Sequence, residues 1–113
     1  MENYNKNINK DCINNECYRK IIYTGKLQII LQSLNPGETV ELEKHIGIDQ
    51  FIRCEYGKGV VIINGNSYLL KNDDAIVIPA GSEHFIYNSS RKKKFKFCTI
   101  YSKPEHSEDQ NLC

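Results

Sequence analysis

The sequence predicts an all-β domain, a barrel or sandwich of seven or eight short strands. Three observations carry this prediction. Segments rich in β-branched and aromatic residues recur along the chain, and polar turns with glycine, proline or asparagine separate them at short, regular intervals. No stretch has the uninterrupted apolar periodicity of a long helix.

The predicted strands begin with residues 27–34 (LQIILQSL), an apolar run that stops at the Asn-Pro-Gly turn of 35–37. Residues 39–45 (TVELEKH) alternate strictly between apolar and polar side chains. This alternation puts Val40, Leu42 and Lys44 on one face and Glu41, Glu43 and His45 on the other.

The later strands are separated by equally clear turn signals. Gly57-Lys58-Gly59 and Asn64-Gly65 are typical of hairpin turns. We expect these strands at 51–56, 60–63, 67–70, 75–79, 84–88 and 94–101.

The two ends of the chain differ from this pattern. Residues 1–18 are rich in Asn and Lys without periodicity, and residues 104–113 are also polar. We therefore expect a single domain over residues 19–103, flanked by two disordered polar tails.

Composition argues against several classes of partner. Fifteen Lys+Arg balance 14 Asp+Glu, so the formal charge is +1 and no global field favours nucleic acid or an anionic membrane. No apolar run approaches the roughly 20 residues that a membrane helix needs. The polar N-terminus lacks the apolar stretch of a secretory signal. We expect a cytoplasmic protein that contacts neither membrane nor nucleic acid.

The five cysteines predict little chemistry. They are Cys12, Cys17, Cys54, Cys98 and Cys113, an odd number without a Cys-x-x-Cys pair. A disulfide framework is not expected in a cytoplasmic protein. Because Cys54 and Cys98 lie inside apolar strands, we expect them to be small buried hydrophobic side chains.

Four side chains are expected to meet at one rim of the sheets. Glu43 and His45 project from the same face of one strand, Gln50 begins the next strand, and His84 begins a later strand after a Pro-x-Gly turn. Imidazole nitrogen combined with carboxylate or amide oxygen suits a divalent metal such as Fe, Mn, Ni, Co or Zn.

The spacing of these residues resembles the two sequence motifs of the cupin family. The first motif runs from Gly37 to Gly57 (GETVELEKHIGIDQFIRCEYG), with Glu43 and His45 at the two histidine positions and Gln50 at the glutamate position. The second is DDAIVIPAGSEHFIYN, which ends at Asn88. The chain is most similar to small stand-alone cupins with a DQFIR-like segment and a C-terminal YSxPEH-like segment.

This resemblance implies a jelly-roll β-barrel with a divalent metal held in its mouth by Glu43, His45, Gln50 and His84. Relative to the usual motif, the carboxylate moves from the third position to the first, so the net charge of the ligand set is unchanged. Glu43 would serve as a general base if it is not a ligand. Asn88 and Gly81 are expected to be structural.

The function implied is the binding of a small oxygen-rich molecule, such as a sugar, a uronate or a carbonyl compound. Whether the chain is an enzyme stays open: isomerase, epimerase and dioxygenase chemistries occur among proteins it resembles, and the fold does not select among them. The alternatives are a non-catalytic binding module without metal and a cupin that acts only through dimer contacts. A homodimer is expected in each case.

Three further residues lie near the predicted site. Arg53 is expected to point outward, toward the surface or a dimer contact. Glu41 shares the face of Glu43 and would need a partner if it were buried. His106 lies in the C-terminal tail, which either stays exposed or folds over the barrel mouth.

Residues 91–97 (RKKKFKF) interleave cations with aromatic rings, a pattern that can bind single-stranded nucleic acid. Lys94 and Lys96 also alternate with Phe95 and Phe97, as they would in an edge strand with a charged outer face. Because the chain is nearly neutral, we interpret this segment as an edge strand.

Overall fold

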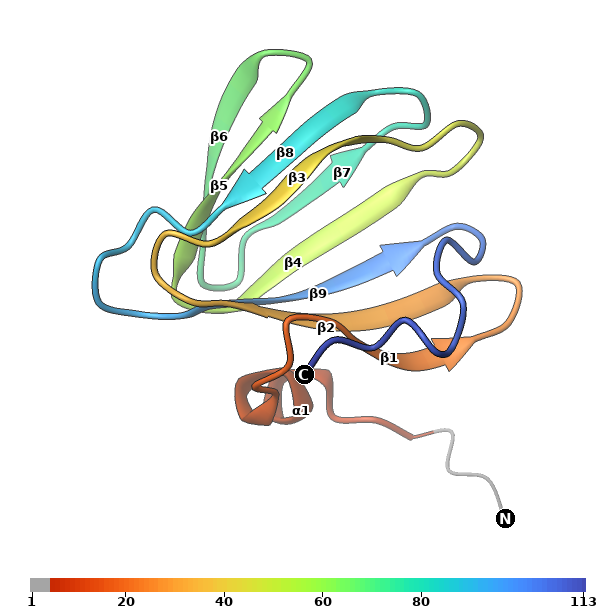
Figure 1. Ribbon diagram of the computed structural model, residues 1–113, viewed down its shortest axis with the longest axis horizontal. Helices are drawn as coiled ribbons and strands as arrows, with labels where there is room; N and C mark the ends of the chain where they lie inside the picture. Colours follow the sequence, from red (N-terminus) through yellow and green to blue (C-terminus); the bar gives the residue numbers. More distant parts are fainter. Residues whose placement is uncertain (1–4) are drawn as a thin grey trace.

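The computed structural model describes residues 5–113, and nine strands make up about half of it (Figure 1). A single short helix, α1, spans Ile8–Asn14 in this part of the chain. The strands are β1 (Lys20–Thr24), β2 (Gln28–Leu34), β3 (Thr39–Lys44), β4 (Gln50–Tyr56), β5 (Lys58–Ile63), β6 (Asn66–Lys71), β7 (Ala75–Ile78), β8 (Glu83–Tyr87) and β9 (Phe95–Tyr101).

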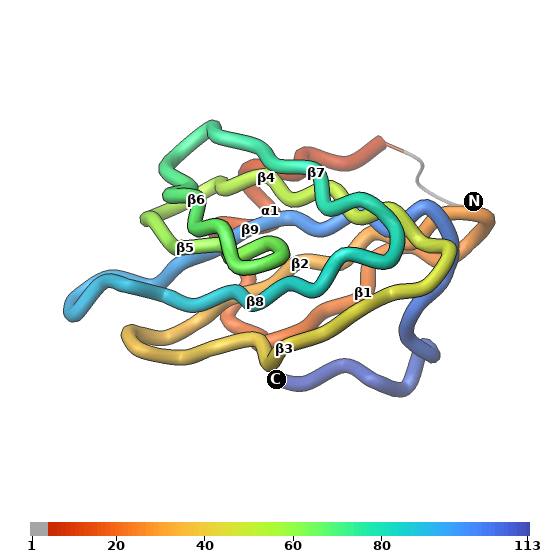
Figure 2. The backbone as a smooth tube through the Cα atoms, turned by 90° about the horizontal axis from the view of Figure 1, so that it is seen from above, coloured from red at the N-terminus to blue at the C-terminus, as the bar shows by residue number. Residues whose placement is uncertain are grey.

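The strands form two antiparallel sheets that face each other. One sheet has the order β1-β2-β9-β4-β7 and the other the order β3-β8-β5-β6. Seen from above, β3, β8, β5 and β6 lie across one side of the barrel (Figure 2). The main core lies between the sheets and includes Leu34, Ile52, Val61, Ile86 and Phe97, all of which are buried. The all-β jelly-roll prediction is confirmed.

Eight of the nine strands, β2 to β9, are predicted by the sequence pattern, and β1 is not. Residues 20–24 carry the apolar run Ile21-Ile22-Tyr23, but they are half-buried or exposed rather than buried. β1 pairs only with β2 among the described strands, as the outermost strand of its sheet. So short a run, with no alternation, gives little signal.

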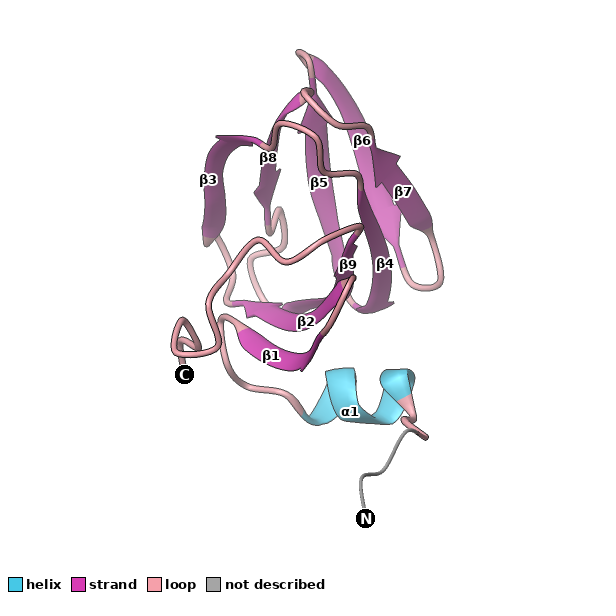
Figure 3. Ribbon diagram, turned by 90° about the vertical axis from the view of Figure 1, so that its right-hand side faces the viewer, coloured by secondary structure: helices cyan, strands magenta, loops and turns pink. Residues whose placement is uncertain are grey.

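The N-terminal segment is more ordered than its composition predicts. Residues 8–14 form α1, which packs on the outer side of the five-stranded sheet against β2, β9 and β4 (Figure 3). The helix begins where the Asn7 side chain accepts a hydrogen bond from Lys10 N. It buries Cys12 against Leu31 and Cys98. Because Cys12 is the one buried side chain among the seven residues of α1, the helix has no apolar periodicity by which the sequence could predict it.

The prediction that the last strand is an edge strand is wrong. β9 lies in the middle of its sheet, between β2 and β4. Its outward-facing Lys96 is buried beneath the N-terminal segment, where its Nζ donates to Ile13 O at 2.5 Å and Glu16 Oε1 at 3.2 Å. Lys94 also pairs with Glu16. The lysines of this segment therefore anchor residues 13–16, a long-range contact that a charge pattern cannot reveal.

A disulfide bond joins Cys17 to Cys113, contrary to the expectation of unreactive cysteines. The two residues are 96 positions apart and lie in the two segments expected to be tails. The C-terminal segment runs back along the barrel, and Leu112 pairs with Arg19 through both backbone groups. Cys12, Cys54 and Cys98 are free and buried. The buried state of Cys54 and Cys98 confirms that prediction.

Within residues 5–113 no helix has the length and apolar character needed to cross a membrane.

Candidate metal centre

Strands β3 and β8 bring two of the candidate ligands face to face. Glu43 and His84 are direct partners in the antiparallel register of these strands. A β-bulge lies between Val40 and Glu43, so the predicted strict alternation of this strand is wrong. Val40 enters the core and Leu42 stays 63% exposed, while Glu43 still turns toward the barrel. The bulge thus allows an apolar core residue and a polar site residue to point to the same side.

Glu43, His45 and His84 form a compact group that could hold a metal ion. One ligand atom from each lies within 4.8 Å of the others. The two imidazole rings have centroids 4.9 Å apart. Both histidines are buried, and Glu43 is partly exposed toward the mouth. Two imidazoles and one carboxylate suit Fe(II), Mn, Co, Ni or Zn.

The neighbours of the two histidines favour the same free nitrogen on each ring. His84 Nδ1 is hydrogen-bonded to Ser82 O at 3.1 Å, and His45 Nδ1 lies 3.0 Å from Glu105 Oε1 in an ion-pair contact. A carbonyl oxygen can only accept, which puts the ring proton of His84 on Nδ1, and the Glu105 carboxylate favours the same tautomer of His45. This is the arrangement of a metal-binding histidine whose other nitrogen is held by an outer carboxylate or carbonyl.

A buried nitrogen without a hydrogen bond also fits a metal-binding role for His45. His45 Nε2 is buried and accepts no hydrogen bond from residues 5–113. Glu43 Oε2 lies only 3.2 Å away, but the contact does not have hydrogen-bond geometry. A buried imidazole nitrogen beside a carboxylate, with no hydrogen bond between them, fits a cation bound to both.

Burial keeps the second histidine neutral. Desolvation is the main cause that lowers the pKa of His84 below its ordinary value, and the neighbouring His45 acts in the same direction. A neutral imidazole is the form that binds a metal. Burial also raises the pKa of Tyr101, whose ring contacts the His45 ring edge-on at 5.5 Å. Tyr101 therefore stays a phenol and closes one side of the group.

Gln50 is buried at the start of β4, beside this group. It is the register partner of Tyr101, the residue whose ring contacts His45. Its Oε1 is buried and has no hydrogen-bond partner in the described part of the chain. An amide oxygen without a donor fits a fourth ligand.

Loops from three parts of the chain fix the rim around the site. Gly81, at φ +82°, donates its N–H to His45 O at 2.9 Å and so joins the turn before His84 to the end of β3. Asp49 Oδ1 accepts from Ala80 N at 2.8 Å in the same turn. The Asp49 N–H donates to Ser102 Oγ at 2.9 Å, and the Ser102 N–H donates to Asp49 O at 2.9 Å. Asn88 bonds Leu34 O and Lys93 O at the other end of β8, so its structural role is confirmed.

Two residues near the site were missed by the sequence analysis. Glu105 supplies the carboxylate that holds His45. Arg19 enters a pocket shared with Glu43. The YSxPEH-like segment is the only sequence signal for Glu105, and none exists for Arg19. The C-terminal segment does fold against the mouth: the His106 ring contacts Tyr101, with centroids 5.9 Å apart.

The remaining charged residues named from the sequence lie away from the group. Glu41 is exposed and needs no buried partner. Arg53 points outward as expected, where it pairs with the buried Glu55 at 2.8 Å and with Asp73 at 2.9 Å.

Comparison with known proteins agrees with this geometry. Residues 30–101 match the model of the family described as "Cupin domain". The chain is 37% identical over 107 residues to the uncharacterised YrkC protein of Bacillus subtilis (strain 168), and equally similar to an uncharacterised protein of Acanthamoeba polyphaga mimivirus. The matches cover 88% and 91% of this chain. It spans 57% of the length of YrkC and 67% of the viral protein.

A solved structure extends the likeness to the whole fold. The crystal structure of BH2720 from Bacillus halodurans superposes with a TM-score of 0.89 at 33% identity. The match covers 94% of this chain and 85% of BH2720. Because the family model covers residues 30–101 and the relatives cover most of the chain, this protein belongs to the cupin domain family.

Proposed function

We propose that this cupin binds a divalent metal ion through Glu43, His45 and His84, with Gln50 as a fourth ligand, and uses it to bind a small oxygen-rich molecule. The observation that carries the proposal is the pair of histidines. Each ring has its Nδ1 next to an acceptor, which favours a free Nε2 in a group that also contains a carboxylate.

The donor set decides which metals fit. Two imidazole nitrogens with carboxylate and amide oxygens favour Fe(II), Mn, Co, Ni or Zn over Mg or Ca, which prefer oxygen alone. A metal of this kind acts as a Lewis acid on a carbonyl or hydroxyl oxygen. Glu43 is only partly buried, so it can reach both the metal position and the mouth.

The protein's own residues would then orient the ligand and exclude water. Tyr101 and His84 close the inner side of the site, and both are buried. If Glu43 does not bind the metal, its carboxylate is the group placed to accept a proton from a bound molecule. The alternative is a cupin that binds its ligand without metal and without turnover. The homodimer and the cytoplasmic location stay predictions.

Elemental analysis of protein purified without chelator tests the proposal. Wild-type protein should carry close to one equivalent of a transition metal. His45→Ala and His84→Ala should each lose it, whereas His106→Ala, the third histidine of the chain, should retain it. A folded wild-type protein that binds none of these metals, even when they are added, would exclude the metal-dependent function and leave the metal-free binding module.

A further inference from the structure

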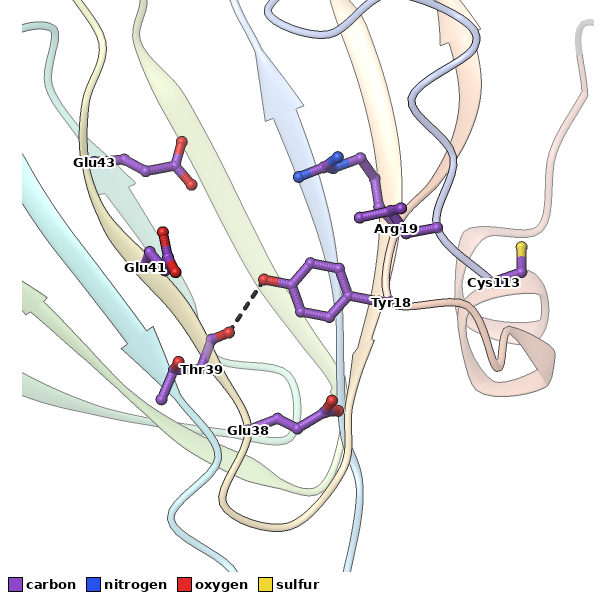
Figure 4. A pocket seen from close by; sticks show the side chains of 8 residues that line it. Tyr18, Arg19, Glu38, Thr39, Glu41, Glu43 and Cys113 are labelled. Atoms are coloured by element: carbon purple, nitrogen blue, oxygen red, sulfur yellow. Dashed lines mark hydrogen bonds between the residues drawn. The ribbon is translucent and has the colours of Figure 1, made fainter.

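A pocket of about 530 Å³ adjoins the candidate metal centre and opens to the surface. It lies between β3 and the segment that leads into β1 (Figure 4). Its lining residues are Tyr18, Arg19, Glu38, Thr39, Glu41, Glu43, Leu112 and Cys113. The volume falls within the range of small-molecule sites. Glu43 belongs both to this pocket and to the metal-binding group, so a molecule in the pocket would lie next to the metal.

Arg19 is the cationic residue of this pocket, and its charge has no partner. Its guanidinium lies across the pocket from Glu43 (Figure 4). No carboxylate of residues 5–113 forms an ion pair with it. Its Nη1 donates to Gln110 O at 3.1 Å. Its Nε is buried and donates to no group in the described chain. Because the buried Nε is closed to a ligand and Nη1 is bonded, Nη2 is the donor of the guanidinium left for a molecule in the pocket.

The neighbours of Arg19 hold the guanidinium in place. Its Cζ lies 5.9 Å from the centroid of the Tyr18 ring, a cation–π contact. The Tyr18 hydroxyl in turn donates to Thr39 O at 3.1 Å. The backbone of Arg19 is paired with Leu112, so the segment that supplies Gln110 O is fixed as well. A guanidinium held in place in this way is suited to binding a carboxylate.

We propose that the guanidinium of Arg19, through Nη2, binds the carboxylate of a small organic acid, and that a hydroxyl or carbonyl oxygen beside this carboxylate faces the Glu43 end of the pocket. The ligand class of the site is then a hydroxy acid, a keto acid or a uronate. This assignment rests on the proposed metal-dependent function, because the second oxygen needs the metal.

The other charges of the pocket favour a ligand with one negative charge over one with two. Glu38, Glu41 and Glu43 contribute three carboxylates. Arg19 and a divalent ion together offset these three charges, so the pocket has no excess positive charge to hold a dianion. Glu38 also lies at the opposite end of the pocket from Arg19, with its Oε1 on Asn35 N (Figure 4). A phosphate ester is therefore a poorer ligand than a carboxylate.

Calorimetric titration of the metal-loaded full chain tests this inference with three probes. Glycolate carries a carboxylate beside a hydroxyl, ethylene glycol replaces the carboxylate by a second hydroxyl, and inorganic phosphate supplies a dianion. The variants are Arg19→Gln and Arg19→Lys. Arg91→Gln is the matched control, because it removes the same charge from an exposed loop position.

Wild-type protein should bind glycolate more tightly than ethylene glycol or phosphate. Arg19→Gln should weaken glycolate binding by about tenfold to a hundredfold, the loss expected for charged hydrogen bonds, with little change for ethylene glycol. Arg19→Lys should lose several-fold, because it keeps the charge without the planar guanidinium. If Arg19→Gln does not fold, the glycolate affinity of Arg19→Lys tests the role of Arg19. Arg91→Gln should match wild type.

Metal content of the same preparations separates this inference from the function on which it rests. Equal glycolate affinity in wild type and both Arg19 variants, all fully loaded, overturns the role of Arg19 alone. Failure of the fully loaded wild type to bind glycolate overturns it too. A wild-type protein that cannot be loaded overturns the metal-dependent function.

Discussion

Glu105 holds the imidazole of His45 with a 3.0 Å contact between its Oε1 and the ring Nδ1, across 60 positions of the chain. The backbone N–H groups of Glu105 and His106 both donate to Gln28 Oε1 at 3.0 Å. Gln28 Nε2 donates back to His106 O at 2.8 Å. Because Gln28 is fully buried in β2, the carboxylate is attached to the core of the barrel. The same C-terminal segment supplies Gln110 O to Arg19.

Removing the Glu105 carboxylate should weaken metal binding without removing a ligand. An outer carboxylate fixes the tautomer and orientation of a ligating histidine, and its loss typically costs 10–100-fold in metal affinity. We expect a loss of about this size for Glu105→Ala. Glu105→Gln should lose less, because its amide oxygen can still accept from Nδ1.

Competition of each variant with a coloured chelator measures these affinities. Glu108→Gln is the control, since Glu108 is exposed in the same segment. Wild-type metal affinity in Glu105→Ala would show that the carboxylate does not position His45 for the metal.

The disulfide should stabilise the fold without setting metal affinity. A bond between residues 96 positions apart restricts the unfolded chain, and such bonds contribute about 2–4 kcal/mol. Reduction, or Cys113→Ser, should lower the free energy of unfolding in urea by about this amount. Metal affinity should change less than in Glu105→Ala, because Gln28 holds Glu105 independently of the bond.

Reductant distinguishes the disulfide from a simple packing effect of Cys113. It should destabilise wild type and leave Cys113→Ser unchanged. Equal stability of oxidised and reduced wild type would contradict the prediction.

The barrel could be predicted from the sequence because the sequence signals for strands and turns are local. Alternation and turns such as Asn64-Gly65 each lie within a few residues, and Glu43, His45 and His84 occur within two short motifs whose spacing is visible in the sequence. The bulge after Val40 could not be predicted, because it depends on how β3 pairs with β8. Nor could the role of Lys96, since its partners precede it by about 80 positions.

The outer part of the site was out of reach for a related reason. Glu105 lies in a polar segment that looks like a tail and Arg19 directly follows another, and they acquire their positions only when these parts of the chain meet along the barrel. Nothing in the composition of either segment marks it as folded. Pairs of residues that contact each other at such separations are found by structure rather than by pattern.

The three free cysteines should be unreactive in the folded protein. Burial raises the pKa of Cys12 and of Cys98 to about 12 and that of Cys54 to about 11, because it disfavours the thiolate. At pH 8 a thiol with a pKa of 12 is ionised in about one molecule in 10⁴, against about one in ten at a pKa of 9. Raising the pH toward 10 should increase the rate of labelling while the fold persists.

Counting thiols by iodoacetamide labelling and mass spectrometry checks this prediction and the disulfide together. Native protein should label slowly, denatured protein should take three labels, and denatured and reduced protein should take all five. Rapid labelling of native protein would contradict the burial of these thiols. Five labels without reductant would contradict the disulfide.

Gly57, which ends the first motif, should tolerate substitution much less than Gly65. Both have a positive φ, +80° at Gly57 and +83° at Gly65, so alanine strains the backbone at either position by about 1–2 kcal/mol. A Cβ at Gly65 would meet nothing within 4 Å. At Gly57 it would lie 2.2 Å from Lys94 O, a backbone atom that leads into the central strand β9. Gly57→Ala therefore forces β4, β5 and β9 apart where they meet.

Urea unfolding of the two variants separates strain from collision. Gly65→Ala should lose about 1–2 kcal/mol of the free energy of unfolding. Gly57→Ala should lose clearly more than Gly65→Ala, because the backbone of a central strand cannot move aside as a flexible side chain can. Equal losses in the two variants would mean that the chain near Lys94 shifts freely. The close approach at Gly57 would then not be the reason for a glycine at this position.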